Sequence, residues 1–279
     1  MITAQDINQL RRKTGSGMMD CKKALTAAEG DFDRAIEILR EKGQKISTAR
    51  ADRVTTEGAI FAQTNETHDY GIMIALSCET DFVAKNEVFQ HLGQTVLEAA
   101  FMHQPATLAD LLEVAAGGGL SIREKITEVV SKIGEKVAIS TYTSLSSETV
   151  VSYIHMGSKL GVLVGLQGGH GSQVVEAGRD VAMQIAAMHP LAIDEDGIDP
   201  TVMDSELTIA KEQARNAGKP EIMLDKIAQG RLHKFLKENT LLNQPFVKDN
   251  GRTITQYLAG VAPSLTVVAF ERATVATTS

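Results

Sequence analysis

The first part of the chain, residues 1–43, consists of short amphipathic stretches separated by glycines. Apolar residues recur there at helical spacing in three successive stretches, which predicts three short helices. Thr3 with Asp6 three positions later predicts an N-terminal cap for the first helix. Gly43 is placed where a glycine ends a helix, and the polar, basic and weakly periodic residues 44–55 are expected to form a linker, either irregular or partly helical.

This pattern resembles the three-helix bundle of ubiquitin-associated domains, in which the first loop carries a glycine followed by an exposed hydrophobic residue. The corresponding loop here is residues 15–19, GSGMM. Neighbouring residues on a helix are about 100° apart, so Met18 and Met19 are not expected to face the bundle core together. We expect one of them on the surface, either as a contact residue, for which methionine is well suited, or as an ordinary surface position.

Beyond the linker the hydrophobic pattern occurs twice. Residues 71–76 (GIMIAL) match residues 161–166 (GVLVGL), and each run is followed by a long amphipathic stretch. Further strand-like runs are 58–62 and 137–142 in the first copy and 150–155 and 265–270 in the second. The repeat predicts an α+β body of two related subdomains with small antiparallel sheets, one at 56–145 and one at 146–279.

The second copy contains extra helical sequence. Two helix-like stretches within about 200–240 are joined by a short turn at 218–220, which predicts an antiparallel helical hairpin inserted into the second subdomain. Their charged flanks favour a projecting arm, of coiled-coil type. Residues 273–279 are expected to form a C-terminal tail.

Composition narrows the classes of function. The chain has 279 residues, a net charge of −7 and no dense basic block, which argues against direct nucleic-acid binding. It has no apolar run long enough for a membrane helix and no visible leader, so we expect a cytoplasmic location. No metal-ligand spacing, phosphate-binding loop or catalytic constellation is evident. We therefore expect no metal, no cofactor and no enzymatic activity.

The most informative stretch is residues 78–86, CETDFVAKN, between the strand-like run 71–76 and the following helix. It places a phenyl ring, Phe82, beside the carboxylate of Asp81 in a connection without glycine. The second copy has only QGGHGS at this point (167–172), so the fold closes there without such a pair. A contact function for Phe82 and an aromatic ring packed into its own loop remain the two alternatives.

The residues also match a known family. Residues 10–25 (LRRKTGSGMMDCKKAL) and 78–86 resemble two signatures of the elongation factor Ts family. Residues 132–135 and 153–164 also resemble segments of that family, and the likeness covers essentially the whole chain. Lys159, where Arg is usual, and Ala75, where many members carry an acidic residue, depart from the family pattern outside residues 80–83.

The resemblance implies a guanine-nucleotide exchange factor for the GTPase elongation factor Tu, which it would bind in the GDP-bound or nucleotide-free form. It implies that Asp81 and Phe82, within the segment that also holds Thr80 and Val83, insert beside the nucleotide site of the partner and help to dislodge its Mg²⁺. A homodimer through the core is left open.

Further contacts are implied for Met18 and Met19 of the head. The matching segments of the body imply contacts for Ile133, Gly134 and His155. Two other hypotheses remain at this point. One is an adaptor or scaffold that acts through its ubiquitin-associated-like head, and the other is a thiol enzyme based on Cys78, which would need a histidine beside it.

Overall fold

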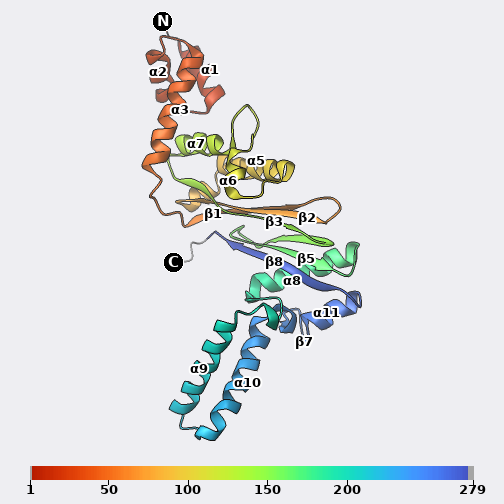
Figure 1. Cartoon of the computed structure of the whole chain (residues 1–279). Coiled ribbons are helices and arrows are strands. Elements are labelled where there is room, and N and C mark those ends of the chain that lie inside the picture. Colours follow the sequence, from red (N-terminus) through yellow and green to blue (C-terminus); the bar gives the residue numbers. More distant parts are fainter. Residues whose placement is uncertain (1, 276–279) are drawn as a thin grey trace.

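The computed structural model describes residues 2–275 as a helical head, a layered body and a helical arm on the opposite side of the body from the head (Figure 1). The body holds two three-stranded antiparallel sheets that lie face to face, each covered on its outer side by helices. The predicted α+β class, with small antiparallel sheets and an inserted helical hairpin, is confirmed.

The head consists of α1 (Ala4–Thr14), α2 (Met18–Ala27) and α3 (Phe32–Ala49). Thr3 and Asp6 form the predicted capping box, in which each side chain accepts a hydrogen bond from the backbone N–H of the other residue. Gly15 ends α1 with a φ of 66°, a conformation that favours glycine. Buried side chains from all three helices form the core of the head: Leu10, Cys21, Ala24, Leu25, Ala28, Ala35 and Leu39.

The predicted helix end at Gly43 is wrong, because α3 continues to Ala49 and caps at Arg50. Residues 44–49, expected to lie in a linker, are therefore helical. Gly43 instead lies where α3 crosses α7 (Ile122–Ile133): a Cβ at this position would be 3.1 Å from the Cβ of Ser131. Without a side chain at residue 43, the two helices can approach closely, and this contact seats the head on the body.

The first sheet has the strand order β1 (Glu57–Thr64), β2 (Tyr70–Cys78), β3 (Val137–Ser146). Its outer side is covered by α5 (Glu87–His103), α6 (Leu108–Glu113) and α7. Alternate residues of β2 point to opposite sides: Ile72, Ile74 and Leu76 pack against the helices, and Met73 and Ala75 pack against the second sheet. Both faces of β2 are buried, which explains its nearly continuous apolar sequence.

The second sheet has the order β4 (Thr149–Ile154), β5 (Leu160–Gln167), β8 (Thr266–Thr274). Its outer side is covered by α8 (Ser172–Met188) and α11 (Ile254–Val261). A small hairpin of β6 (Pro245–Phe246) and β7 (Asp249–Thr253) precedes α11. The predicted strands of both copies are all present in the sheets.

The two sheets exchange equivalent contacts. The backbone N–H of Ile60 in β1 donates to the carbonyl of Ser158 in the β4–β5 turn at 2.7 Å. In the same way, the N–H of Val150 in β4 donates to the carbonyl of His68 in the β1–β2 turn at 2.5 Å. Each hairpin turn thus lies on the first strand of the other copy, as the sequence repeat would lead one to expect.

The arm is formed by α9 (Pro200–Asn216) and α10 (Glu221–Asn239), which pack against each other and project away from the sheets (Figure 1). Two short 3-10 turns, Glu195–Gly197 and Leu241–Asn243, flank it. None of the helices in the described part of the chain is long and apolar enough to cross a membrane.

The predicted C-terminal tail needs correction at its start. β8 runs to Thr274, and Val275 is buried with Ala273 between the two sheets. Ala273 and Val275 therefore belong to the core of the body, because their apolar side chains fill the space between the sheets. The remaining positions, 276–279, lie outside the described residues.

Candidate functional site

The segment 80–84 follows β2 and forms a helix of one turn, α4 (Asp81–Ala84), where the sequence suggested only a connection. Thr80 is its N-cap, and its hydroxyl accepts a hydrogen bond from the backbone N–H of Val83. Val83 and Ala84 are buried in the core beneath the turn. Phe82 points outward and is 83% exposed, so the alternative of an aromatic ring packed into its own loop is wrong.

Asp81 lies beside the exposed ring and carries its own counter-ion. Its carboxylate accepts a hydrogen bond from the Lys85 ammonium at 2.8 Å. This hydrogen bond holds the pKa of Asp81 below its usual value of 3.8, and the charges of Lys85 and Lys159 act in the same direction. Asp81 is therefore ionised at neutral pH and presents a negative charge next to an unshielded aromatic ring.

The corner between α7 and β3 lies against this segment. Gly134 ends α7 with a φ of 78°, and Ile133 before it is half-buried against the core. Glu135 follows, and its carboxylate accepts hydrogen bonds from the backbone N–H of Thr80 at 3.0 Å and from the Thr80 hydroxyl at 2.9 Å. The structure thus brings Ile133 and Gly134 next to residues 80–83.

The β4–β5 turn of the second copy also borders the site. His155 is exposed, and its Nδ1 is 2.9 Å from the hydroxyl of Tyr153. Lys159 at the end of the turn forms an ion pair with Glu57 at 2.5 Å. Its positive charge also contributes to the lowered pKa of Asp81. Met156, beside His155, is 91% exposed.

Sequence reasoning assigned no role to Met156. A lone methionine in a turn gives no periodic signal, so only the structure reveals how far it projects.

Met18 and Met19 lie at the start of α2 in the head, which is on the far side of α7 from the sheets (Figure 1). Their exposed fractions are 53% and 62%, so both are on the surface, where we expected only one. The reason is that Cys21 and Leu25, one and two turns further along α2, already fill the core of the head. The two methionines form a second exposed apolar surface, separate from Phe82.

Cys78 has the environment of a structural thiol. It is fully buried, and its Sγ donates to the backbone carbonyl of Thr80 at 3.2 Å. Burial raises its pKa to about 12, and the negative charges of Glu135 and Glu57 add to the effect. Because nucleophilic attack requires the thiolate, this environment argues against a thiol enzyme.

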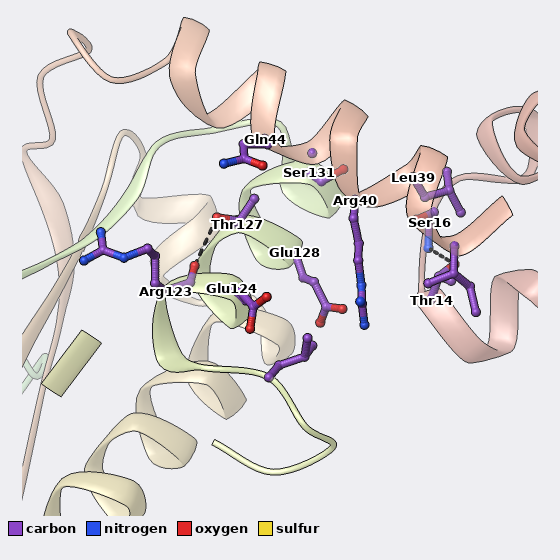
Figure 2. A pocket seen from close by; sticks show the side chains of 13 residues that line it. Thr14, Ser16, Leu39, Arg40, Gln44, Arg123, Glu124, Thr127, Glu128 and Ser131 are labelled. Atoms are coloured by element: carbon purple, nitrogen blue, oxygen red, sulfur yellow. Dashed lines mark hydrogen bonds between the residues drawn. The ribbon is translucent and has the colours of Figure 1, made fainter. Parts of the chain in front are cut away.

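A cavity of about 190 Å³ lies at the joint between the head and the body. Figure 2 shows the side chains that line it, from the end of α1, from α3 and from α7. Its lining combines the apolar side chains of Ile36, Leu39 and Leu120 with charged and polar side chains: Arg40, Arg123, Glu124, Glu128, Thr14, Ser16, Gln44, Thr127 and Ser131. Within residues 2–275 no group of His, Cys, Asp and Glu side chains is arranged to hold a metal ion.

The chain is similar to known proteins over nearly its whole length. The family model described as elongation factor TS matches residues 79–277. Elongation factor Ts of Amoebophilus asiaticus is 60% identical over 271 residues, which cover 97% of this chain and 98% of that protein. The proteins of the same name from Cytophaga hutchinsonii and Clostridium acetobutylicum are 50% and 41% identical, over 97% and 93% of this chain and 98% and 86% of their own lengths.

Proposed function

The chain belongs to the elongation factor Ts family and is thus a translation elongation factor; on that premise we propose that it binds the GTPase elongation factor Tu and promotes the release of GDP. The partner would be bound in its GDP-loaded or nucleotide-free form. The chain would act as a regulatory binding protein, without making or breaking a covalent bond. As a translation factor it would act in the cytoplasm.

The observation that carries the proposal is the exposure of Phe82 on an anchored turn. An aromatic ring that is 83% exposed gains little from its own chain, but it can bury a large apolar area in a partner. Residues of this kind dominate the binding energy of many interfaces. The backbone that carries the ring is held by the buried Val83 and Ala84, so the ring is presented in a defined direction.

Asp81 would act on the polar surroundings of the partner's nucleotide. Its carboxylate is charged, and its one ion pair among residues 2–275 is with Lys85, a side chain that is itself largely exposed. At the partner's Mg²⁺ site such a carboxylate would compete for the groups that hold the ion and its waters. We propose that Phe82 opens the space beside the nucleotide and that Asp81 helps to displace the Mg²⁺, with Thr80 and Val83 holding the segment in shape.

The thermodynamic basis is reciprocal coupling. If the chain binds nucleotide-free partner more tightly than GDP-bound partner, then GDP must bind the complex more weakly by the same factor. GDP is released faster when this weaker binding results from a larger dissociation rate constant. No catalytic residue is needed for this effect.

Two more surfaces would complete the contact. Ile133 and Gly134 directly precede Glu135, which binds Thr80, and the exposed His155 lies in the β4–β5 turn with Lys159, whose charge acts on Asp81. These residues would extend the contact around Phe82. The exposed Met18 and Met19 would hold a second part of the GTPase, because they lie in the head. Two separated contacts would fix the orientation of Phe82 relative to the nucleotide.

The test is the release of a fluorescent GDP analogue from elongation factor Tu, followed with excess unlabelled GDP. Wild-type chain should accelerate release, and Phe82→Ala should lose most of the acceleration. Met102→Ala is the matched control, since Met102 is an exposed apolar residue of the same subdomain, at the end of α5. No acceleration by the wild type would refute the proposed function, and an undiminished Phe82→Ala would refute the proposed mechanism.

A second arm of the experiment tests Asp81. Asp81→Asn should slow release when Mg²⁺ is in excess and should matter much less when a chelator has already removed the ion. An equal effect of Asp81→Asn under both conditions would contradict a role in displacing Mg²⁺.

A further inference from the structure

Two glutamates hold the α4 segment to the α7–β3 corner in a reciprocal arrangement. The Glu79 carboxylate accepts the backbone N–H of Lys136 at 2.7 Å, and the Glu135 carboxylate accepts the backbone N–H of Thr80 at 3.0 Å. Each of the two segments thus supplies one carboxylate and one backbone donor to the other. We call these four residues the glutamate clasp.

The clasp is itself anchored to the end of the head's long helix. The guanidinium of Arg50, the residue that caps α3, donates to both oxygens of Glu79, at 3.0 and 3.3 Å. The ammonium of Lys136 donates to the backbone carbonyls of Ala51 and Arg53, at 2.6 and 2.9 Å. The clasp therefore joins three segments that are far apart in the sequence.

Glu135 differs from Glu79 in having no cationic partner. Among the described residues it forms no ion pair, and both of its carboxylate oxygens bind Thr80, one through the backbone N–H and one through the hydroxyl. A half-buried carboxylate without a counter-ion loses hydration on folding. Its two hydrogen bonds instead fix the position of Thr80, the N-cap residue of α4.

That position decides where Phe82 points. A helix of one turn is too short to be stable by itself, and the exposed Phe82 ring has almost no contacts that could orient it. The direction of the ring therefore depends on the backbone of α4. This backbone is held from below by Val83 and Ala84 and at its start by Thr80.

We propose that Glu135 is a positioning residue for nucleotide exchange, which acts through Thr80 to set the direction of Phe82 before the partner binds. This inference rests on the proposed function. Pre-organisation of a contact residue lowers the entropy lost on binding, and a small misplacement of a positioned group can cost a large factor in rate. Glu135 should therefore influence exchange without touching the partner.

The experiment measures kcat/KM for GDP release from elongation factor Tu with Glu135→Ala, Glu135→Gln and the control Glu113→Ala. Glu113 is a carboxylate of the same subdomain that pairs with Arg123 in the first turn of α7, whereas the clasp follows the last turn of that helix, so the loss of Glu113 should leave exchange unchanged. Glu135→Ala should lower kcat/KM roughly tenfold, as expected for loss of a hydrogen bond to a charged group. Glu135→Gln keeps one acceptor oxygen and should lie between Glu135→Ala and the wild type.

A double-mutant cycle separates positioning from general damage to the fold. If Glu135 acts through Phe82, the double variant Phe82→Ala/Glu135→Ala should be no slower than Phe82→Ala alone. With Met19→Ala, on the distant head, the effects of Glu135→Ala should simply multiply. The cycles use variants whose unfolding midpoint shows that they are folded at the assay temperature, and Glu135→Gln replaces Glu135→Ala if the latter is not.

The outcomes distinguish this inference from the proposal on which it rests. If Phe82→Ala is impaired and the effects of Phe82→Ala and Glu135→Ala multiply, Glu135 does not act through Phe82 and the inference is overturned. The same holds if Glu135→Ala exchanges as fast as the wild type. If Phe82→Ala is unimpaired, the proposed mechanism fails first, and the inference fails with it.

Discussion

Two phenylalanines seven positions apart should respond in opposite ways to replacement by alanine. Phe82 is 83% exposed on α4, whereas Phe89, in the first turn of α5, is fully buried in the core of the first subdomain. Phe82→Ala should weaken binding to elongation factor Tu and leave the stability of the free chain unchanged. Phe89→Ala should strongly lower the stability of the free chain.

The magnitudes follow from the exposed areas. A phenylalanine can bury about 200 Å², of which 83% or about 170 Å² is available to a partner in the case of Phe82. At about 25 cal/mol per Å² this corresponds to at most about 4 kcal/mol of binding free energy, or about a thousandfold in Kd. For stability, Phe82→Ala should stay within about 0.5 kcal/mol, whereas Phe89→Ala should cost about 3–5 kcal/mol.

The assays are urea unfolding, followed by circular dichroism, and titration of nucleotide-free elongation factor Tu by calorimetry. A loss of more than about 1.5 kcal/mol of unfolding free energy in Phe82→Ala would show that the ring packs on its own chain. An unchanged Kd for Phe82→Ala would show that the exposed ring is not buried by the partner. Either result would refute the reasoning.

Three further predictions concern the surroundings of the site. In a Cys21→Ala background, Cys78 should resist iodoacetamide at pH 8 in the folded chain and react after unfolding, because a pKa of about 12 leaves roughly one thiolate in ten thousand; rapid labelling of the folded chain would contradict the buried environment. Glu79 has a pKa below its usual value of 4.5, chiefly because it accepts the backbone N–H of Lys136, so it stabilises the fold above about pH 4.5 and loses this effect as the pH falls through its folded pKa. Urea midpoints of Glu79→Gln should therefore lie below those of the wild type at pH 7 and converge with them in acid, and a constant difference down to pH 3 would contradict this assignment. Gly93→Ala should lower the unfolding free energy by about 1–3 kcal/mol, because the new Cβ would lie 2.2 Å from the ring of Phe61; an unchanged urea midpoint would mean that the ring moves aside freely.

The sequence predicted most of the helices and strands of the molecule. Strand and helix periods are local properties, so runs such as 71–76 and 161–166 identify buried strands without knowledge of their neighbours. Gly43 shows the limit of this approach. Its sequence context is that of a helix end, and only the contact with Ser131 of α7 explains why the helix continues and why the residue is small.

The sequence allowed us to single out the exposed residues of the candidate site, but not the residues that hold them in position. Phe82 and Asp81 stood out because a large ring beside a charge is unusual in a connection. Glu135 did not, since its role depends on a hydrogen bond to a residue fifty-five positions away. Met18 and Met19 were predicted to differ in exposure because the argument considered one helix and not how its neighbours fill the core of the head.

The reciprocal contacts between the two copies have a consequence for how the chain can be modified. The β4–β5 turn of the second copy borders α4 of the first, and the β1–β2 turn correspondingly lies on β4 of the second copy. The second corner, around the exposed His170 and Gly171, has no counterpart of α4. A short peptide inserted between these two residues, as a tag or as the attachment point for a fluorophore, would therefore leave the exposed ring on α4 free. If the two halves were instead produced as separate fragments divided between β3 and β4, the apolar faces of both sheets would be exposed to water, so labelled versions of this protein should be made by insertion and not by fragment assembly.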